Sequence, residues 1–229
     1  MKLAGRSPAA GFFVGGPAAG RAGRDYFAGP FAVWLPPFFA ALMITLEPFT
    51  AADFPQLMAW VADERLLKEW SGAMFAYPLT EAGLAWYVEG ANNPHDPDVF
   101  IYKAVDARTG AAVGHISLGG ISARDHAGRI TRVLVGNTSE RRRGICQGMV
   151  RALLRVGFEE LGLHRISLGV YDFNHAAIQC YLKCGFRQEG LLRDVVRHEA
   201  GYWSLVEMGI LEDEWRALPA APAGPANGG

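Results

Sequence analysis

Hydrophobic positions between residues 43 and 216 recur with a period of two in some segments and a period of 3.6 in others. This alternation predicts the strands and helices of one mixed α/β domain, in which helices pack on a sheet. The predicted strands span residues 44–48, 99–105, 112–121, 129–135, 164–170, 186–192 and 202–211. The polar and glycine residues at 106–110 predict a hairpin turn between the second and third strands.

Helices are predicted where a residue that favours a helix N-terminus precedes an apolar stripe. The three capping residues are Thr50, Thr80 and Asn174. The longest amphipathic segment, 145–161, is followed by Gly162, which suits a helix C-terminus. Residues 70–72, between the first two helices, have the sequence Trp-Ser-Gly and are predicted to be a loop.

Both ends of the chain differ in composition from the segment between them. Residues 1–42 are rich in alanine, glycine, proline and phenylalanine without a helical or strand period, so we expect a disordered N-terminal extension. The uncharged stretch 26–46 contains three prolines that would interrupt a membrane-spanning helix, and no membrane anchor is expected. Residues 217–229 are expected to be a disordered tail, which leaves 43–216 as the folded domain, with Met43 as an internal start.

The formal net charge of −1 provides no overall field that would draw the protein to nucleic acid or an acidic membrane, so neither is expected as a partner. The three cysteines, Cys146, Cys180 and Cys184, include no C-x-x-C pair. This spacing predicts neither a disulfide framework nor a zinc ribbon and favours a reducing cytoplasm. Cys180 and Cys184 lie one helical turn apart with His175 nearby, but a fourth ligand is not evident, so no metal is expected.

Three arginines, Arg141, Arg142 and Arg143, precede Gly144 at the start of the long helix. A helix N-terminus presents unpaired N–H groups and a partial positive charge, and glycine lets an anion approach the backbone closely. The segment therefore suits a pyrophosphate, and it lacks the sequence patterns of ATP-binding and dinucleotide-binding loops. A solvated loop whose glycine serves only the turn explains the same residues equally well.

The stretch from Arg141 to Cys146 resembles the R/Q-x-x-G-x-G/A signature of the GNAT superfamily of N-acetyltransferases. Cys146 stands where that signature has glycine or alanine. A second segment resembles the family's N-x-x-A-x-x-x-Y-x-x-x-G-F motif through Asn174, Ala177, Tyr181, Gly185 and Phe186. The two motifs follow one another in the family's order, and the resemblance covers residues 44–215.

The resemblance implies the GNAT acyl-CoA N-acyltransferase fold, a mostly antiparallel sheet splayed between two central parallel strands, 129–135 and 164–170. It also implies acetyl-CoA as the cosubstrate. The residues that it places against acetyl-CoA are Val133, Val135, Arg141, Arg142, Arg143, Gly144, Ile145, Cys146, Gln147, Gly148 and Asn174.

In this family the acceptor amine attacks the thioester directly, so the resemblance implies no covalent enzyme intermediate. Tyr181 corresponds to the general acid that protonates the leaving thiolate, and the alternative for this residue is a packing role. The general base is not identified, because strand 129–135 lacks the glutamate that many relatives carry there. His115 is a substitute base, although a single histidine on a strand is more often structural.

The acceptor site is expected near the first two helices. Trp70, Phe75 and Tyr77 could line an amine pocket or belong to the core. Glu64 and Glu69 could attract a cationic amine or be solvated charges at a helix end.

We therefore predict an N-acetyltransferase that moves an acetyl group from acetyl-CoA to a primary amine of a small molecule or a protein N-terminus. The closing segment 201–215 resembles the branch of ribosomal-protein-alanine acetyltransferases. The alternatives are an aminoglycoside acetyltransferase, a non-catalytic acyl-CoA-binding sensor on the same fold, and an RNA-binding module that uses the arginines. The predicted partners are acetyl-CoA and an amine acceptor, and a homodimer could form.

Overall fold

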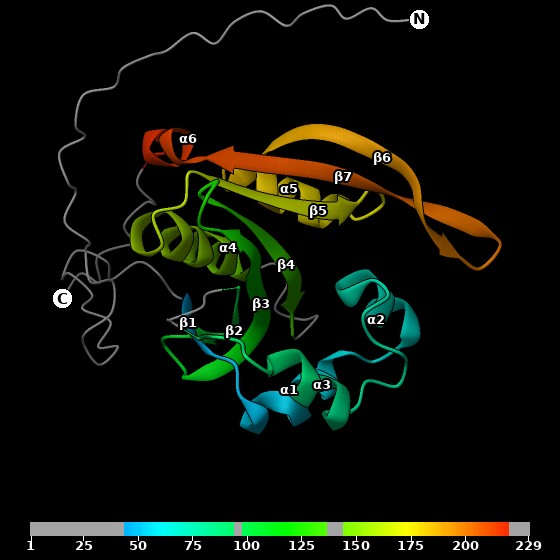
Figure 1. Cartoon of the computed structure of the whole chain (residues 1–229). Coiled ribbons are helices and arrows are strands. Elements are labelled where there is room, and N and C mark those ends of the chain that lie inside the picture. Colours follow the sequence, from blue (N-terminus) through cyan, green and yellow to red (C-terminus); the bar gives the residue numbers. More distant parts are fainter. Residues whose placement is uncertain (1–43, 94–97, 137–143, 220–229) are drawn as a thin grey trace, which may run out of the picture. The chain divides into compact units, whose positions relative to one another are not determined.

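The computed structural model describes residues 44–93, 98–136 and 144–219. Within them, seven strands form one sheet in the order β1-β2-β3-β4-β5-β7-β6 (Figure 1). The strands are β1 (Ile44–Pro48), β2 (Val99–Asp106), β3 (Ala111–Ser122), β4 (Ala127–Val135), β5 (Arg165–Tyr171), β6 (Arg187–His198) and β7 (Gly201–Leu211). Every neighbouring pair is antiparallel except β4 and β5, which confirms the predicted GNAT-type sheet with a parallel pair at its centre.

The helices of the described residues follow the predicted caps, with some additions. They are η1 (Ala51–Asp53), α1 (Phe54–Trp60), α2 (Glu64–Ser71), α3 (Glu81–Val88), α4 (Ile145–Arg155), the π-helical turn η3 (Val156–Glu160), α5 (His175–Lys183) and α6 (Glu212–Ala217). The side chain of Thr80 accepts a hydrogen bond from Gly83 N, and that of Asn174 accepts one from Ala177 N. These two of the three predicted caps are therefore confirmed as the start of a helix. Thr50, the third, precedes the short 3-10 helix η1, and Asp53 is the residue at the N-cap of α1.

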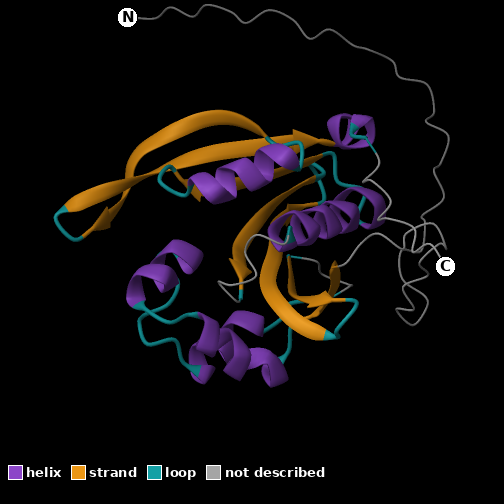
Figure 2. Ribbon diagram, turned by 180° about the vertical axis from the view of Figure 1, so that it is seen from behind, coloured by secondary structure: helices purple, strands orange, loops and turns teal. Residues whose placement is uncertain are grey.

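Two hydrophobic clusters hold the helices, drawn purple in Figure 2, against the sheet. The larger cluster includes Met149 and Leu153 of α4 and Ile178 of α5, which pack with sheet residues such as Ile116. The smaller cluster joins α1, α2 and α3 to β2 and β4. The two groups of helices thus cover different parts of the sheet and leave the central strands between them.

The two central strands separate partway along their length. β4 and β5 pair only from residues 127–130 to residues 165–168. Beyond that point β4 contains a bulge, because His115 pairs with Leu134 whereas Ser117 pairs with Thr131. Two β4 residues, Arg132 and Val133, therefore stand opposite a single residue of β3. This divergence opens the middle of the sheet.

The loop prediction for residues 70–72 is wrong. Trp70 and Ser71 complete α2, which is capped by Asp63 through a 2.7 Å hydrogen bond from Leu66 N, and Gly72 follows with φ 64°. Leu67 and Trp70 lie three positions apart on the buried face of α2, so the helical period continues through Trp70.

The ends of the folded domain are described only in part. The prediction for residues 1–42 lies outside the described residues, as does that for residues 220–229. Ala217 is the last residue of α6 rather than the first of a disordered tail. None of the helices in the described part of the chain combines the length and the apolar character needed to cross a membrane.

Candidate active site

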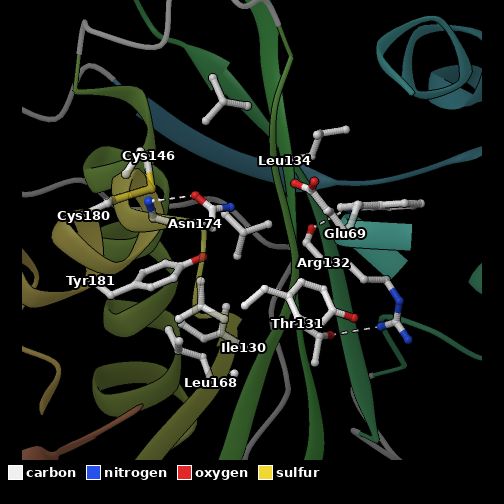
Figure 3. A pocket seen from close by; sticks show the side chains of 18 of the residues that line it. Glu69, Ile130, Thr131, Arg132, Leu134, Cys146, Leu168, Asn174, Cys180 and Tyr181 are labelled. Atoms are coloured by element: carbon white, nitrogen blue, oxygen red, sulfur yellow. Dashed lines mark hydrogen bonds between the residues drawn. A yellow bond between two sulfur atoms is a disulfide. The ribbon is translucent and has the colours of Figure 1, made fainter. Parts of the chain in front are cut away.

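A pocket of about 820 Å³ lies where β4 and β5 diverge (Figure 3). Its walls come mainly from these two strands, from α2, from the first turn of α4 and from α5. In Figure 3, Asn174 and Tyr181 lie on one side of the pocket, and Glu69 and Arg132 lie on the other. The pocket therefore has two chemically different sides.

The first turn of α4 forms one end of the pocket. Gly144 caps this helix with φ 78° and ψ 10°, the left-handed conformation that glycine adopts without steric cost. The N–H groups of the following turn have no helical partner, so this end attracts an anion. Cys146 and Gln147 line the pocket beside Gly144, as do Val133 and Val135 of β4. The structure thus brings these five predicted residues to one place.

The other predicted cosubstrate residues lie elsewhere. Arg141, Arg142 and Arg143 lie outside the described residues. Ile145 is buried in the core and is not part of the pocket lining. Gly148 is explained by packing, because a Cβ atom there would lie 2.6 Å from Cγ1 of Ile44, so glycine allows α4 to approach β1 closely.

Helix α5 places two polar side chains at the pocket. Asn174 uses its Oδ1 atom to cap the helix, at 3.1 Å from Ala177 N, and its side-chain amide faces the pocket (Figure 3). Tyr181 is buried, and its hydroxyl points toward the space between the strands (Figure 3). Burial, followed by the nearby Cys184, raises the pKa of the Tyr181 phenol, so the group stays protonated at neutral pH.

The cysteine prediction is wrong. Cys146 of α4 and Cys180 of α5 form a disulfide, with Cα atoms 6.6 Å apart. Cys184 is a free, buried cysteine. Since Cys146 and Cys180 are 34 positions apart and share no short motif, only the packing of α4 on α5 reveals the pair. The bond also removes the reason for expecting a reducing compartment.

His115 lies in an aromatic cluster and not in the pocket lining. Its side chain is fully buried against Phe49, Trp70 and Tyr87, and its Nε2 atom shares a 3.2 Å hydrogen bond with the Tyr87 hydroxyl. Burial, aided by the positive charge of Arg132, lowers the pKa of His115 to about 3. The imidazole is therefore neutral and enclosed, which gives no support to its predicted catalytic role.

The acceptor residues expected near the first helices divide into two groups. Trp70 and Glu69 line the pocket, and Glu69 accepts a 2.9 Å hydrogen bond from Arg65 Nε. Burial and the charge of Glu69 both raise the pKa of Tyr171, another lining residue. The remaining members of the predicted set, Glu64, Phe75 and Tyr77, are not part of the pocket lining.

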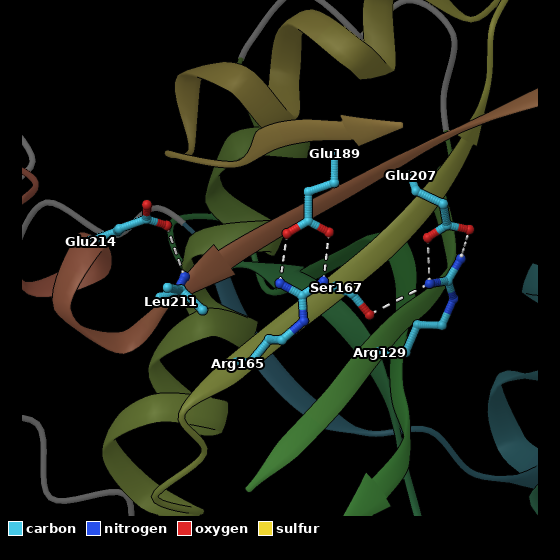
Figure 4. Close-up of polar contacts among 7 residues, drawn as sticks. All are labelled: Arg129, Arg165, Ser167, Glu189, Glu207, Leu211 and Glu214. Atoms are coloured by element: carbon cyan, nitrogen blue, oxygen red, sulfur yellow. Dashed lines mark hydrogen bonds and ion pairs between the residues drawn. The ribbon is translucent and has the colours of Figure 1, made fainter. Parts of the chain in front are cut away.

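Two arginines on β4 were not identified from the sequence. Arg129 donates two hydrogen bonds, of 2.7 and 2.8 Å, to the carboxylate of Glu207 on β7 (Figure 4). Arg132 sits in the bulge of β4. Glu207, two strands away from β4 in the sheet, neutralises Arg129 and is not part of the pocket lining.

Residues 43–187 match the family model described as an acetyltransferase (GNAT) domain. The chain belongs to the GNAT acetyltransferase family. This GNAT domain therefore contains the pocket between the central strands, and the resemblance inferred from the two sequence motifs is confirmed at the level of the family.

Curated relatives of this GNAT protein include two proteins from Bacillus subtilis (strain 168). The SPbeta prophage-derived uncharacterized N-acetyltransferase YokL is 31% identical over 75 residues, which cover 33% of this chain and 42% of YokL. The uncharacterized N-acetyltransferase YnaD is 30% identical over 81 residues, which cover 35% of this chain and 48% of YnaD. The chain thus spans less than half the length of either relative.

Solved structures support the same fold. Spermidine N-acetyltransferase from Vibrio cholerae, in complex with CoA and spermine, superimposes with a TM-score of 0.66 at 20% identity, covering 76% of this chain and 98% of that one. A spermidine N-acetyltransferase SpeG K23-Q34 chimera from Vibrio cholerae and hSSAT superimposes with a TM-score of 0.64 at 20% identity, covering 77% of this chain and 99% of the chimera. At this identity the similarity concerns the architecture of the GNAT domain, and it does not transfer the substrate.

Proposed function

We propose that this GNAT domain is an N-acetyltransferase that moves the acetyl group of acetyl-CoA to a primary amine by direct attack. The observation that carries the proposal is the convergence of two groups on one pocket. The open first turn of α4, at Gly144, and the hydroxyl of Tyr181 both face the space between β4 and β5. An anion site and a proton donor are the two groups that this transfer needs from the protein on the cosubstrate side.

In the proposal, the first turn of α4 receives the pyrophosphate of acetyl-CoA, and Arg141, Arg142 and Arg143 add charge to the same site. The backbone of Val133 and Val135 borders the pantetheine arm, where the bulge and the divergence of β4 from β5 leave its edge open. Asn174 provides its side-chain amide, since its Oδ1 atom is already used by the helix cap.

The proposed reaction forms a bond between the acceptor nitrogen and the thioester carbon, and the carbon–sulfur bond breaks as the tetrahedral intermediate collapses. Tyr181 donates its proton to the departing CoA thiolate, because burial keeps the phenol protonated until that charge develops. Glu69 holds the acceptor ammonium on the opposite side of the pocket, where the nitrogen loses one proton to solvent before it attacks. The second proton, which the nitrogen loses after the attack, also passes to solvent, and solvent returns one proton to the Tyr181 phenolate.

The acceptor proposed from the closing segment is a protein N-terminus or the amine of a small molecule. The likeness of residues 201–215 to ribosomal-protein-alanine acetyltransferases supports the protein N-terminus. The spermidine acetyltransferases share the architecture at 20% identity and favour a small-molecule acceptor only by analogy. The pocket lining described here holds one carboxylate, which does not favour a polycationic aminoglycoside.

The test is the appearance of an acetylated amine. The full chain is incubated with acetyl-CoA and a panel of small amines and N-terminal peptides, and acetylated products are identified by mass spectrometry. We expect acetyl transfer that depends on both substrates. Tight acetyl-CoA binding by calorimetry without acetylation of any amine would instead support the non-catalytic sensor, and RNA binding that acetyl-CoA leaves unchanged would support the RNA-binding module.

A further inference from the structure

The pocket carries more positive than negative side chains. Among its described lining residues, the cationic ones are Arg65, Arg129, Arg132 and Lys183, and the one carboxylate is Glu69. Lys183 ends α5, on the side assigned to the cosubstrate. Arg65 comes from α2, and Arg129 and Arg132 come from β4. Of these, Arg132 lies on the side of the pocket opposite Asn174 and Tyr181, together with Glu69 (Figure 3).

Two of these arginines are neutralised by carboxylates. Arg65 pairs with Glu69 at 2.9 Å, and Arg129 pairs with Glu207 at 2.7 Å. The carboxylate side chains of Glu69 and Glu207 are only 22% and 25% exposed, so each charge is held mainly by its arginine. Glu207 is not part of the pocket lining, so Glu69 is the one carboxylate among the described lining residues, and a single carboxylate does not suit an acceptor with several ammonium groups.

Arg132 has a different environment. Its guanidinium donates a 3.0 Å hydrogen bond to Thr131 Oγ1 and lies 4.9 Å from the centre of the Tyr87 ring. Within the described part of the chain, no carboxylate forms an ion pair with Arg132, and its buried Nε atom has no hydrogen-bond acceptor. Among the described residues, the guanidinium of Arg132 is therefore the arginine charge of the pocket lining that no carboxylate neutralises.

The backbone conformation at residue 132 does not favour a long side chain. Its φ of 52° lies in the left-handed region, where a long side chain is strained and where glycine or asparagine is easier to accommodate. The bulge is held from the acceptor side, because Trp70 Nε1 donates a 2.9 Å hydrogen bond to the carbonyl oxygen of Arg132. An arginine at this position is therefore better explained by what its guanidinium binds than by the conformation of the strand.

We propose that Arg132 binds a carboxylate of the acceptor, so that the acceptor is an amine that also carries a carboxylate, as an amino acid does, and not a polyamine. The inference rests on the proposed acetyl transfer. Glu69 and Arg132 lie on the same side of the pocket, across from Tyr181 (Figure 3). An acceptor of this class presents its ammonium to Glu69 and its carboxylate to Arg132. The planar guanidinium suits a carboxylate, which it can bind through two hydrogen bonds.

The first experiment uses the unmodified protein. Rates of acetylation are compared for a set of free amino acids, for the corresponding amino acid amides, which keep the amine and lose the carboxylate, and for spermidine. We expect kcat/KM for the best amino acid to exceed that for its amide by roughly tenfold to a hundredfold, the effect of one charged hydrogen-bonded contact. A preference for spermidine, or equal rates for acid and amide, would overturn the inference.

The second experiment asks whether Arg132 causes the preference. Arg132→Gln should raise KM for the amino acid and reduce the ratio of acid to amide to about one, while Arg132→Lys should restore part of the ratio because it restores the charge without the planar fork. Arg124→Gln is the matched control, because Arg124 is exposed in the turn between β3 and β4 and does not line the pocket. A ratio that survives Arg132→Gln would assign the preference to another residue.

These outcomes separate the inference from the function on which it rests. If no amine is acetylated, the proposed acetyl transfer fails. If amines are acetylated without regard to the carboxylate, only the role of Arg132 fails. Acetyl-CoA binding by calorimetry and the thermal midpoint serve as folding checks for the variants, and the comparison of acid with amide in the unmodified protein decides the acceptor class even where a variant does not fold.

Discussion

Cys146, in the first turn of α4, is joined by a disulfide to Cys180, which directly precedes Tyr181 on α5. The bond connects the helix that begins at the proposed pyrophosphate site to the helix that carries the proposed general acid. Both cysteines line the same pocket. The disulfide therefore holds together the two helices that must contact the cosubstrate at the same time.

Reduction of this disulfide should destabilise the folded protein. The bond closes a loop between positions 34 apart, and the loop-closure entropy that it removes from the unfolded chain corresponds to about 3–4 kcal/mol in the free energy of unfolding. Urea unfolding with and without dithiothreitol measures this difference. The double variant Cys146→Ser, Cys180→Ser should unfold at the same urea concentration in both conditions, and an equal midpoint for the oxidised and reduced native protein would contradict the prediction.

Replacement of Tyr181 by Phe should slow acetyl transfer without weakening cosubstrate binding. Loss of a positioned proton donor lowers kcat by roughly a hundredfold or more, whereas the aromatic ring still packs against Phe186. Steady-state rates measure the first effect, and calorimetry with acetyl-CoA measures the second. Tyr202→Phe is the control, because Tyr202 on β7 is exposed. If Tyr181→Phe keeps the kcat of the native protein, Tyr181 is not the proton donor and its role is packing.

Gly144→Asp should weaken acetyl-CoA binding by roughly tenfold or more, since it places a negative charge at the helix end that is proposed to bind pyrophosphate. Gly162→Asp is a matched control. Both glycines have positive φ values, 78° and 64°, and both have open space where a Cβ atom would be. The two substitutions should therefore cause similar backbone strain, and only the first should change the affinity for acetyl-CoA. Equal affinities in calorimetry would rule out Gly144 as part of the site.

His115 should make the folded protein sensitive to acid. Its pKa is about 3 in the folded state, against about 6.5 in an unfolded chain. Between these values the unfolded chain binds a proton that the folded protein does not, so stability decreases as the pH falls, by up to about 1.4 kcal/mol per pH unit. Above pH 6.5 this contribution is fully present.

The pH dependence of urea unfolding between pH 7 and pH 4 tests this prediction. The free energy of unfolding of His115→Gln should decrease less on acidification than that of the native protein, whatever the effect of the substitution on stability at neutral pH. His164→Gln, which changes an exposed histidine, should keep the slope of the native protein. If His115→Gln keeps that slope as well, other groups cause the acid sensitivity.

Much of the fold follows from short-range features of the sequence. Alternating apolar positions identify each strand, and Thr80 and Asn174 mark helix starts because their side chains bond to backbone N–H groups three residues ahead. The segment that contains Asn174 and Tyr181 was assigned to the cosubstrate side through its resemblance to the GNAT motif, whose residues all lie within one capped helix and the turn that follows it. The exceptions are α2 and α6, which were not predicted. α6 buries no side chain, whereas α2 is amphipathic and buries Leu67 and Trp70.

The sequence by itself determined the order of strands and helices, the capped helix that bears Tyr181 and the glycine turn that opens α4, because each depends on residues within a few positions of one another. Only the tertiary structure decided the Cys146–Cys180 bond, the pairing of Arg129 with Glu207 and the contact of Trp70 with the bulge at Arg132. These partners are 34, 78 and 62 positions apart. Local periodicity carries no information about such distances, since the sheet order and the packing of helices on it bring the partners together.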